Sequence, residues 1–236
     1  MRDYHDKIIT IKRKYNMNQP LLLCPSTMCI DCDFLKDEII QLDQAGIDIF
    51  HCDIMDGNYV KNMALSPNDV RSICKNTKKP VDVHLMVSNP EVVSELYLKT
   101  DVSIIYIHPD TAEFPDKLLL KIKTAGKKVG IAINPQDSIL KFAKLIPLCD
   151  YILVMTVNPG FAGQKYLEWV EPKIMELILL KNENNFKLIV DGACSPSIIK
   201  KLYHLGVDGF VVGTSALFNK NESYDTIIKQ IRDENK

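Results

Sequence analysis

Short apolar runs alternate with amphipathic segments along almost the whole chain. The apolar runs, rich in β-branched residues, predict strands over residues 21–24, 47–53, 81–86, 102–108, 128–133, 151–156, 187–191 and 209–212. The amphipathic segments that follow them predict helices over residues 33–44, 67–76, 91–99, 115–124, 138–146, 167–181, 196–205 and 224–233. Strands that alternate with helices pair in parallel, because a parallel connection needs a crossover.

Eight such units predict an α/β fold of the (β/α)8 TIM barrel type. An open, doubly wound sheet has the same alternation and stays as the structural alternative. The number of units, and the unusual polar residues at the ends of the strands, favour the barrel. We expect residues 20–236 to form a single barrel domain. We expect residues 1–19 to be an N-terminal extension, which could form a short amphipathic helix.

The composition narrows the possible partners and compartment. The 236 residues are 46% hydrophobic and 25% charged, with a formal net charge of -1. These values are typical of a soluble protein, and they offer no general attraction to nucleic acid or to an anionic membrane, so we expect neither as a partner. No apolar run approaches the roughly 20 residues of a membrane span. The seven cysteines lack the spacing of a zinc module and indicate reduced thiols in a cytoplasmic protein.

Histidines and carboxylates stand near the ends of three predicted strands. His51 and Asp53 are two residues apart and share one strand face, while His84 and Asp191 belong to two later strands. Each of them alone is more often a satisfied core histidine or a turn-forming aspartate. Together, two imidazoles and two carboxylates suit a borderline divalent metal such as Zn, Mn, Co or Fe(II) rather than an oxygen-only Ca or Mg site.

Glycine-containing loops follow the last three predicted strands. Residues 157–164 form a long loop whose glycines let the backbone approach a ligand, although a flexible turn would read the same way. Gly192 follows the seventh strand, and Gly213, Thr214 and Ser215 follow the eighth. This arrangement is typical of the late-barrel phosphate site, where backbone N–H groups hold a dianion without a basic patch.

Six segments together resemble the ribulose-phosphate 3-epimerase family, which has a barrel of the ribulose-phosphate-binding type. They are Pro25-Ser26, His51-x-Asp53-x-Met55-Asp56-Gly57, Asp82-Val83-His84-Leu85-Met86-Val87, residues 155–164, Val190-Asp191-Gly192 and Gly213-Thr214-Ser215. The resemblance extends from about Leu21 to Phe218. It implies a metal-dependent epimerase that inverts C3 of a small ketose phosphate through an ene-diolate.

The resemblance also implies a role for individual residues. The metal ligands would be His51, Asp53, His84 and Asp191, which hold one divalent ion. Asp53 and Asp191 would also be the catalytic acid–base pair, because inversion needs one group to remove the C3 proton and another to return it on the other face. The residues implied to contact substrate are Ser26, His84, Gly160, Phe161, Ala162, Gly163, Gly192, Ala193, Gly213, Thr214 and Ser215. Met55, Met86 and Met155 would pack about the intermediate, although they could equally be ordinary barrel filling.

Details of the motifs look more like the D-allulose-6-phosphate 3-epimerase branch. Typical pentulose enzymes carry Gly-Gly in the sixth loop, where this chain has Ala162-Gly163, and Gly-Gly-Val after the late aspartate, where it has Gly192-Ala193-Cys194. We therefore expect conversion of D-allulose 6-phosphate to D-fructose 6-phosphate, with D-ribulose 5-phosphate to D-xylulose 5-phosphate as the alternative. The family commonly forms dimers or hexamers, which implies a homo-oligomer.

Two other functions fit the residues less well. A barrel decarboxylase needs an Asp-x-Lys-x-x-Asp arrangement, and Met55 occupies the lysine position after Asp53. A non-catalytic phosphate-binding barrel is a remote alternative, disfavoured because both proton-transfer groups and both histidines are present. Lys61 stands where the family usually has proline, which could change the rigidity of the second loop.

Overall fold

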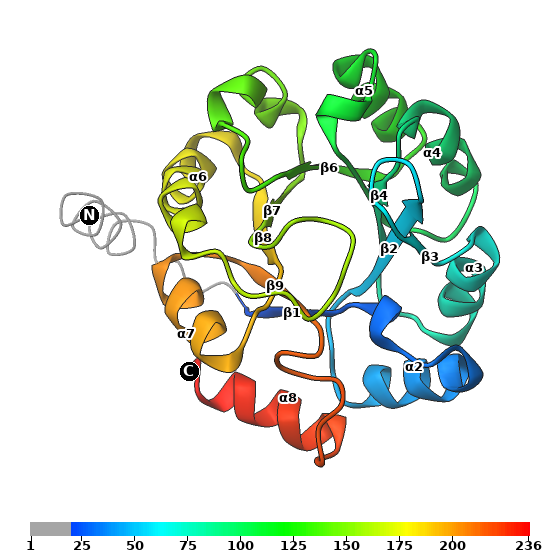
Figure 1. Ribbon diagram of the computed structural model, residues 1–236, viewed down its shortest axis with the longest axis vertical. Coiled ribbons are helices and arrows are strands. Elements are labelled where there is room, and N and C mark those ends of the chain that lie inside the picture. Colours follow the sequence, from blue (N-terminus) through cyan, green and yellow to red (C-terminus); the bar gives the residue numbers. More distant parts are fainter. Residues whose placement is uncertain (1–19) are drawn as a thin grey trace.

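The structure, a computed structural model, describes residues 20–236 as a ring of strands surrounded by helices (Figure 1). The ring consists of β1 (Leu22–Pro25), β2 (Phe50–Asp56), β4 (Val81–Met86), β5 (Ile104–Ile107), β6 (Lys128–Ile133), β7 (Tyr151–Met155), β8 (Lys187–Asp191) and β9 (Gly209–Val212). Neighbouring strands pair in parallel in the order β1-β9-β8-β7-β6-β5-β4-β2. A bridge between Ser26 and His51 joins β1 to β2 and closes the ring. The predicted (β/α)8 barrel is confirmed.

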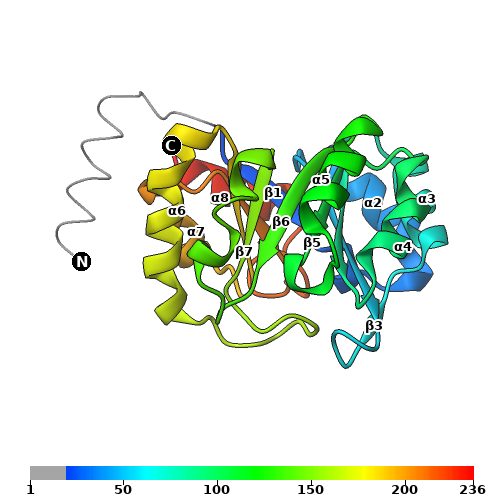
Figure 2. The same cartoon turned by 90° about the horizontal axis from the view of Figure 1, so that it is seen from above.

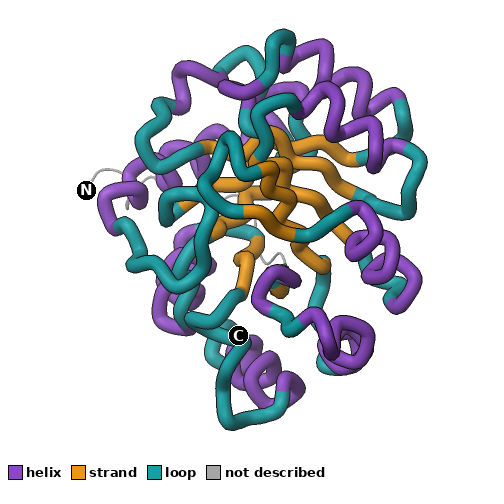
Figure 3. Tube along the Cα trace, turned by 45° about the vertical axis from the view of Figure 1, so that its right-hand side comes forward, coloured by secondary structure: helices purple, strands orange, loops and turns teal. Residues whose placement is uncertain are grey.

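Helices cover the outside of this ring (Figure 3). They are α2 (Leu35–Gln44), α3 (Pro67–Asn76), α4 (Pro90–Leu98), α5 (Pro115–Thr124), α6 (Glu171–Asn184), α7 (Pro196–Leu205) and α8 (Tyr224–Asp233). Side-chain caps define several of their starts, as where Ser66 and Asp69 form a capping box at α3. The predicted boundaries of α3, α5, α7 and α8, and of β4, β6, β8 and β9, are those of the structure.

The predicted α-helix over residues 138–146 is wrong. The structure has two short 3-10 helices there, Ile139–Phe142 and Ile146–Leu148. Pro147 has no N–H to donate to the carbonyl four residues earlier, and it disfavours the helical conformation at the residue before it. The apolar side chains of Ile139, Phe142 and Ile146 are still buried. The amphipathic pattern therefore predicted the buried positions correctly but the wrong type of helix.

The second strand is shifted from its predicted position. Residues 47–53 were expected, whereas β2 begins at Phe50 and continues to Asp56. Asp48 lies before the strand. Its side chain accepts a hydrogen bond from the backbone N–H of Leu23 and forms an ion pair with Arg232. Beyond β2, residues Met63–Ala64 form β3, an unpredicted antiparallel partner that makes a hairpin.

Residues on the barrel strands alternate between two apolar layers. Phe50, Cys52 and Ile54 of β2 pack outward in the cluster shared with the helices. His51 and Asp53 have the opposite parity and face the barrel interior, which is filled elsewhere by side chains such as Tyr106 and Met155. The expected shared face of His51 and Asp53 is therefore confirmed, and Cys52, on the other face, packs against the helices.

The hairpin β2–β3 and the loop after β7 project from the same end of the barrel (Figure 2). This is the end where the parallel strands finish, which in barrels is the end that carries the site. Within residues 20–236, none of the helices has the length and apolar character needed to cross a membrane. The expected extension over residues 1–19 lies outside the described residues.

Candidate metal centre and active site

Three strands bring four polar side chains together at the interior of the barrel. His51 and Asp53 come from β2, His84 from β4 and Asp191 from β8, and one ligand atom of each lies within 4.8 Å of the others. Asp53 and His84 are register partners on adjacent strands. The side chains of His51 and His84 are fully buried, and Asp191 closes the group at the end of β8. The structure therefore brings together the four residues expected to bind metal.

The distances within this cluster suit a small divalent cation. Asp53 Oδ1 lies 3.3 Å from His51 Nε2 and 3.2 Å from His84 Nδ1. Asp191 Oδ2 lies 3.8 Å from each of the same two nitrogens. Ligands about 2.1 Å from a tetrahedral zinc ion are about 3.4 Å apart, so a shared cation fits among these atoms. The donor set of two nitrogens and two oxygens fits the metals expected from the sequence.

Two further buried residues stand behind the histidines. Asp82 Oδ1 lies 2.7 Å from His51 Nδ1, and His108 Nε2 lies 2.8 Å from His84 Nε2. Neither residue was assigned a role from the sequence. The sequence could have indicated Asp82 as a neighbour of the cluster, because it stands two residues before His84 and therefore lies on the same face of the strand. His108 follows the end of β5, and its nearness to His84 depends on how the strands pair.

The two carboxylates of the cluster differ in their affinity for a proton. Burial alone would raise the pKa of Asp53, but the charge of His51 and hydrogen bonds with His51 and His84 hold this pKa well below its usual range. Burial and the charge of Asp53 raise the pKa of Asp191 to about 6. Neighbouring groups with pKa values pushed apart are suited to act as base and acid.

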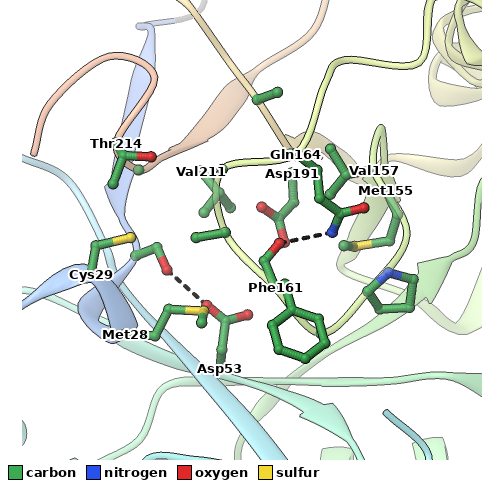
Figure 4. Close-up of a pocket in the computed structure, with 18 of the residues that line it drawn as sticks. Met28, Cys29, Asp53, Met155, Val157, Phe161, Gln164, Asp191, Val211 and Thr214 are labelled. Atoms are coloured by element: carbon green, nitrogen blue, oxygen red, sulfur yellow. Dashed lines mark hydrogen bonds between the residues drawn. The ribbon is translucent and has the colours of Figure 1, made fainter. Parts of the chain in front are cut away.

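A pocket opens above the two carboxylates (Figure 4). Asp53 and Asp191 project into it from different strands, and Ser26 Oγ donates a 2.8 Å hydrogen bond to Asp53 Oδ2. The expected substrate and packing residues that line it are Ser26, Met55, Met86, Met155, Gly160, Phe161, Ala162, Gly163, Gly192, Ala193, Gly213, Thr214 and Ser215. His84, also expected to contact substrate, is fully buried and is not among the lining residues.

Several lining residues were not expected to contact substrate. They include Met28, Cys29, Val157 and Val211. Met28 and Cys29 belong to a 3-10 turn, Thr27–Cys29, that directly follows β1 and brings them to the pocket beside Asp53 (Figure 4). Their position depends on this turn, which has no strand or helix periodicity to reveal it.

The loop after β7 covers the pocket and is held by two contacts. Asn62, from the β2–β3 hairpin, donates a 2.7 Å hydrogen bond to the carbonyl of Gly160. Gln164 donates to the carbonyls of Asn158 and Phe161, which braces the loop from inside. Phe161 itself is 53% exposed, so this cover is largely in contact with solvent.

The pocket wall at the start of this loop depends on one glycine. Gly192, directly after Asp191, has a φ of 122° and lies so close to Val157 that an added Cβ would come within 2.7 Å of its side chain. A side chain here would meet both backbone strain and a clash. Next to it, the Cys194 thiol is buried against the carbonyl of Val190, so this departure from the family pattern packs into the wall behind the pocket.

Comparisons with known proteins extend over most of the chain. Residues 22–218 match a family described as the ribulose-phosphate 3 epimerase family. A ribulose-phosphate 3-epimerase from Synechocystis sp. is 36% identical over 207 residues, which cover 86% of this chain and 90% of that protein. The enzyme of the same name from Escherichia coli is 33% identical over 216 residues, covering 90% of this chain and 95% of its own.

More distant structures share the fold. Phosphoribosyl anthranilate isomerase from Thermus thermophilus has a TM-score of 0.63 at 11% identity, with 91% of this chain and 98% of that chain covered. The tryptophan synthase α subunit from Legionella pneumophila has a TM-score of 0.63 at 13% identity, with 98% of both chains covered. At this identity the likeness concerns the barrel alone.

Proposed function

The chain belongs to the ribulose-phosphate 3-epimerase family of isomerases, and on that premise we propose that it interconverts D-ribulose 5-phosphate and D-xylulose 5-phosphate. The observation that carries this proposal is the facing pair Asp53 and Asp191, joined to two histidines in one cluster at the base of a pocket. An epimerase needs two proton-transfer groups in one site, and this pair comes from strands β2 and β8 on different parts of the ring.

The two carboxylates divide the proton transfers between them. In one direction Asp53, the stronger acid of the pair, removes the C3 proton as a carboxylate, while Asp191 returns a proton on the other face of the carbon. In the reverse direction the roles exchange. The hydrogen bond from Ser26 to Asp53 Oδ2 orients that carboxylate and leaves Oδ1 toward the histidines.

The cluster of His51, Asp53, His84 and Asp191 would hold one divalent metal ion. When bound, such an ion supplies positive charge that stabilises the negative charge developing on the substrate oxygens. Burial of the cluster keeps this interaction strong, because charges interact more strongly away from water.

We place the phosphate of the substrate in the part of the pocket that Gly192, Gly213, Thr214 and Ser215 form. After β9 the chain folds into a tight turn in which the N–H groups of Ala216, Leu217 and Phe218 all point to the carbonyl of Gly213. Those three N–H groups are occupied within the turn, so the groups offered to the phosphate would be the backbone N–H groups of Thr214 and Ser215, which line the pocket. A backbone site of this kind suits a chain with a net charge of only -1.

The comparisons support the pentulose substrate over the hexulose that the motifs predict. Relatives that match about nine-tenths of this chain carry the name ribulose-phosphate 3-epimerase. Ala162 and Ala193 line the pocket where the family pattern has glycine, and these two methyl groups were among the reasons to expect D-allulose 6-phosphate. Methyl groups in a pocket wall change its size without adding a new contact for a sixth carbon.

The test is a comparison of kcat/KM for the two ketose phosphates, measured on protein saturated with the same divalent metal. We expect D-ribulose 5-phosphate to be the better substrate by at least about tenfold. A preference for D-allulose 6-phosphate would overturn the proposed pentulose substrate and favour the hexulose instead. The variants Ala162→Gly and Ala193→Gly, assayed alongside, show whether these methyl groups set the preference.

We also propose that the protein acts as a cytoplasmic homo-oligomer, a dimer or a hexamer. An apolar groove between the β2–β3 hairpin and α4 supports self-association, because Met63 is 77% exposed and Leu96 is 54% exposed on its edges. The seven cysteines, all free in the structure, agree with a reducing compartment. Light scattering of the purified protein tests the assembly, and a monomer at micromolar concentration would contradict it.

A further inference from the structure

The two histidines of the cluster are held from behind by unlike partners. His51 Nδ1 faces the carboxylate of Asp82 at 2.7 Å, whereas His84 Nε2 faces another imidazole, that of His108, at 2.8 Å. Most metal-binding histidines donate their second N–H to a carboxylate, a carbonyl or water. The imidazole behind His84 is therefore the unusual feature of this centre.

The tautomers of this imidazole pair follow from the cluster. Two ring nitrogens at 2.8 Å share one proton, so one ring donates and the other accepts. His84 turns its Nδ1 toward Asp53 Oδ1 at 3.2 Å and Asp191 Oδ2 at 3.8 Å, so Nδ1 needs a free lone pair to bind a cation there. Its proton must then be on Nε2, and His108 must accept it with a proton of its own on Nδ1.

The surroundings of His108 hold its ring in place. Its side chain is fully buried, and its ring packs against His84 at 5.0 Å and against Tyr59 at 4.9 Å between centroids. Its carbonyl accepts hydrogen bonds from the N–H and the hydroxyl of Thr111, which anchors the backbone. A ring held in this position can accept a hydrogen bond through Nε2, while its Nδ1 has no hydrogen-bond partner among residues 20–236.

We propose that His108 is a positioning residue for the metal centre: by accepting the His84 Nε2–H, it holds His84 in the tautomer whose Nδ1 binds the cation. The inference rests on the proposed function for the presence of a metal. His108 itself would contact neither the metal nor the substrate. His51 is positioned by the charge of Asp82, and His84 by a neutral acceptor.

The first test measures zinc affinity by competition with a chromophoric chelator. His108→Phe keeps a flat ring but removes the acceptor, and we expect affinity to fall about 10- to 100-fold. His108→Gln offers an amide oxygen in a similar place and should recover at least part of this loss. Tyr59→Phe, which removes only a hydroxyl bonded to Asn134 from the same packing layer, should bind zinc like the wild type.

The second test reads the tautomers directly in the zinc-loaded wild type. Nitrogen-15 NMR of the imidazoles should show His84 protonated at Nε2 and His108 protonated at Nδ1. A proton on Nε2 of His108 would overturn the proposal, even if the Phe variant does not fold. Wild-type affinity in a folded His108→Phe protein would also overturn it, as would a folded Gln variant as weak as the Phe variant.

The outcomes separate this inference from the proposed function. If the zinc-loaded wild type shows these tautomers but does not epimerise either ketose phosphate, the proposed function fails and the role of His108 stands. If the wild type epimerises but His108→Phe binds zinc normally, the role of His108 fails and the proposed function stands. A wild type that binds no divalent metal contradicts both.

Discussion

The two ends of the barrel use buried aspartates in opposite ways. At the amino ends of the strands, Asp208 lies 2.8 Å from Lys181 and accepts a hydrogen bond from the backbone of Leu188. Asp48 likewise pairs with Arg232 and accepts from Leu23. At these positions a carboxylate just before one strand binds an N–H of the neighbouring strand and a cationic side chain together.

At the carboxyl ends, Asp53 and Asp191 face histidines instead of lysine or arginine. The contacts that the structure gives for Asp191 are with His51 and His84, and those for Asp53 add Ser26. A buried carboxylate needs compensating charge. The amino-end aspartates have it within the chain and stabilise the barrel, whereas the carboxyl-end pair would be completed by the proposed divalent cation and so be available for chemistry.

Substitution of the carboxyl-end pair should have the largest effect on catalysis. We expect Asp53→Asn and Asp191→Asn each to lower kcat by about 10³-fold or more, because each amide can neither remove nor return the C3 proton. In the metal-free protein Asp191→Asn should not lower the free energy of unfolding, because the raised pKa of Asp191 means that its charge does not stabilise the fold, whereas Asp53→Asn loses the attraction to His51 and should be less stable. Steady-state kinetics and thermal unfolding measure the two effects, and near wild-type turnover in either variant would refute the two-base mechanism.

The same substitution at the amino end should have the reverse profile. Asp208→Asn leaves Lys181 buried without its partner, and we expect a loss of about 3 kcal/mol in the free energy of unfolding. The kcat of the folded protein should stay near that of the wild type. Asp233→Asn, which breaks an exposed pair with Lys236, is the matched control and should not change stability measurably. An Asp208 variant as stable as this control would erase the contrast between the two ends.

Metal binding should depend on pH through the groups that lose protons to become ligands. Burial alone would lower the pKa of His51, but Asp82 and Asp53 raise it well above the usual range, while the pKa of Asp191 is raised to about 6. Near pH 7 the affinity should therefore fall about tenfold for each unit of pH lost, and more steeply below about pH 6, where Asp191 also holds a proton.

Isothermal titration of zinc between pH 5 and pH 8 measures this dependence in buffers of different ionisation enthalpy. The Asp191→Asn variant should bind more weakly at neutral pH and lack the steeper region below about pH 6. An affinity independent of pH across this range would mean that the four ligands are not the groups that bind the ion.

The smallest expected effect concerns the cover of the pocket. Asn62→Ala removes the hydrogen bond to Gly160, and we expect KM to rise about fivefold, since one such bond contributes about 1 kcal/mol. The neighbouring Lys61→Ala is the control, because Lys61 is exposed and no hydrogen bond of its side chain shapes the loop. A fall in kcat of the size seen for Asp53→Asn would contradict the division between the reacting groups and the loops above them.

The sequence predicted the chemistry of the site because strand parity is local. His51, Asp53 and Cys52 occupy the faces that alternation assigns to them, and His84 follows the same rule on its own strand. The fold followed from the repeated alternation of strand and helix. One exception, residues 138–146, depended on Pro147, which directly follows the segment.

What the sequence did not predict depends on contacts between distant segments. The meeting of His84 and His108 is set by the pairing of β4 with β5, and the bond from Asn62 to Gly160 joins loops 98 residues apart. The choice between hexulose and pentulose was based on this loop wall, where small differences such as Ala162 were taken to favour the hexulose. The relatives favour the pentulose. The motifs that define the reaction therefore predict the function better than the residues that line the edge of the pocket.

The most direct test of the central claim, that Asp53 and Asp191 exchange the C3 proton of a ketose phosphate, is the isotope content of the product. The metal-loaded protein is incubated with D-ribulose 5-phosphate in deuterium oxide, and the C3 position is followed by NMR. The account predicts D-xylulose 5-phosphate with one deuterium at C3, formed by the wild type and neither by Asp53→Asn nor by Asp191→Asn. A product that retains the original proton, or substrate that stays unchanged with metal bound, would contradict it.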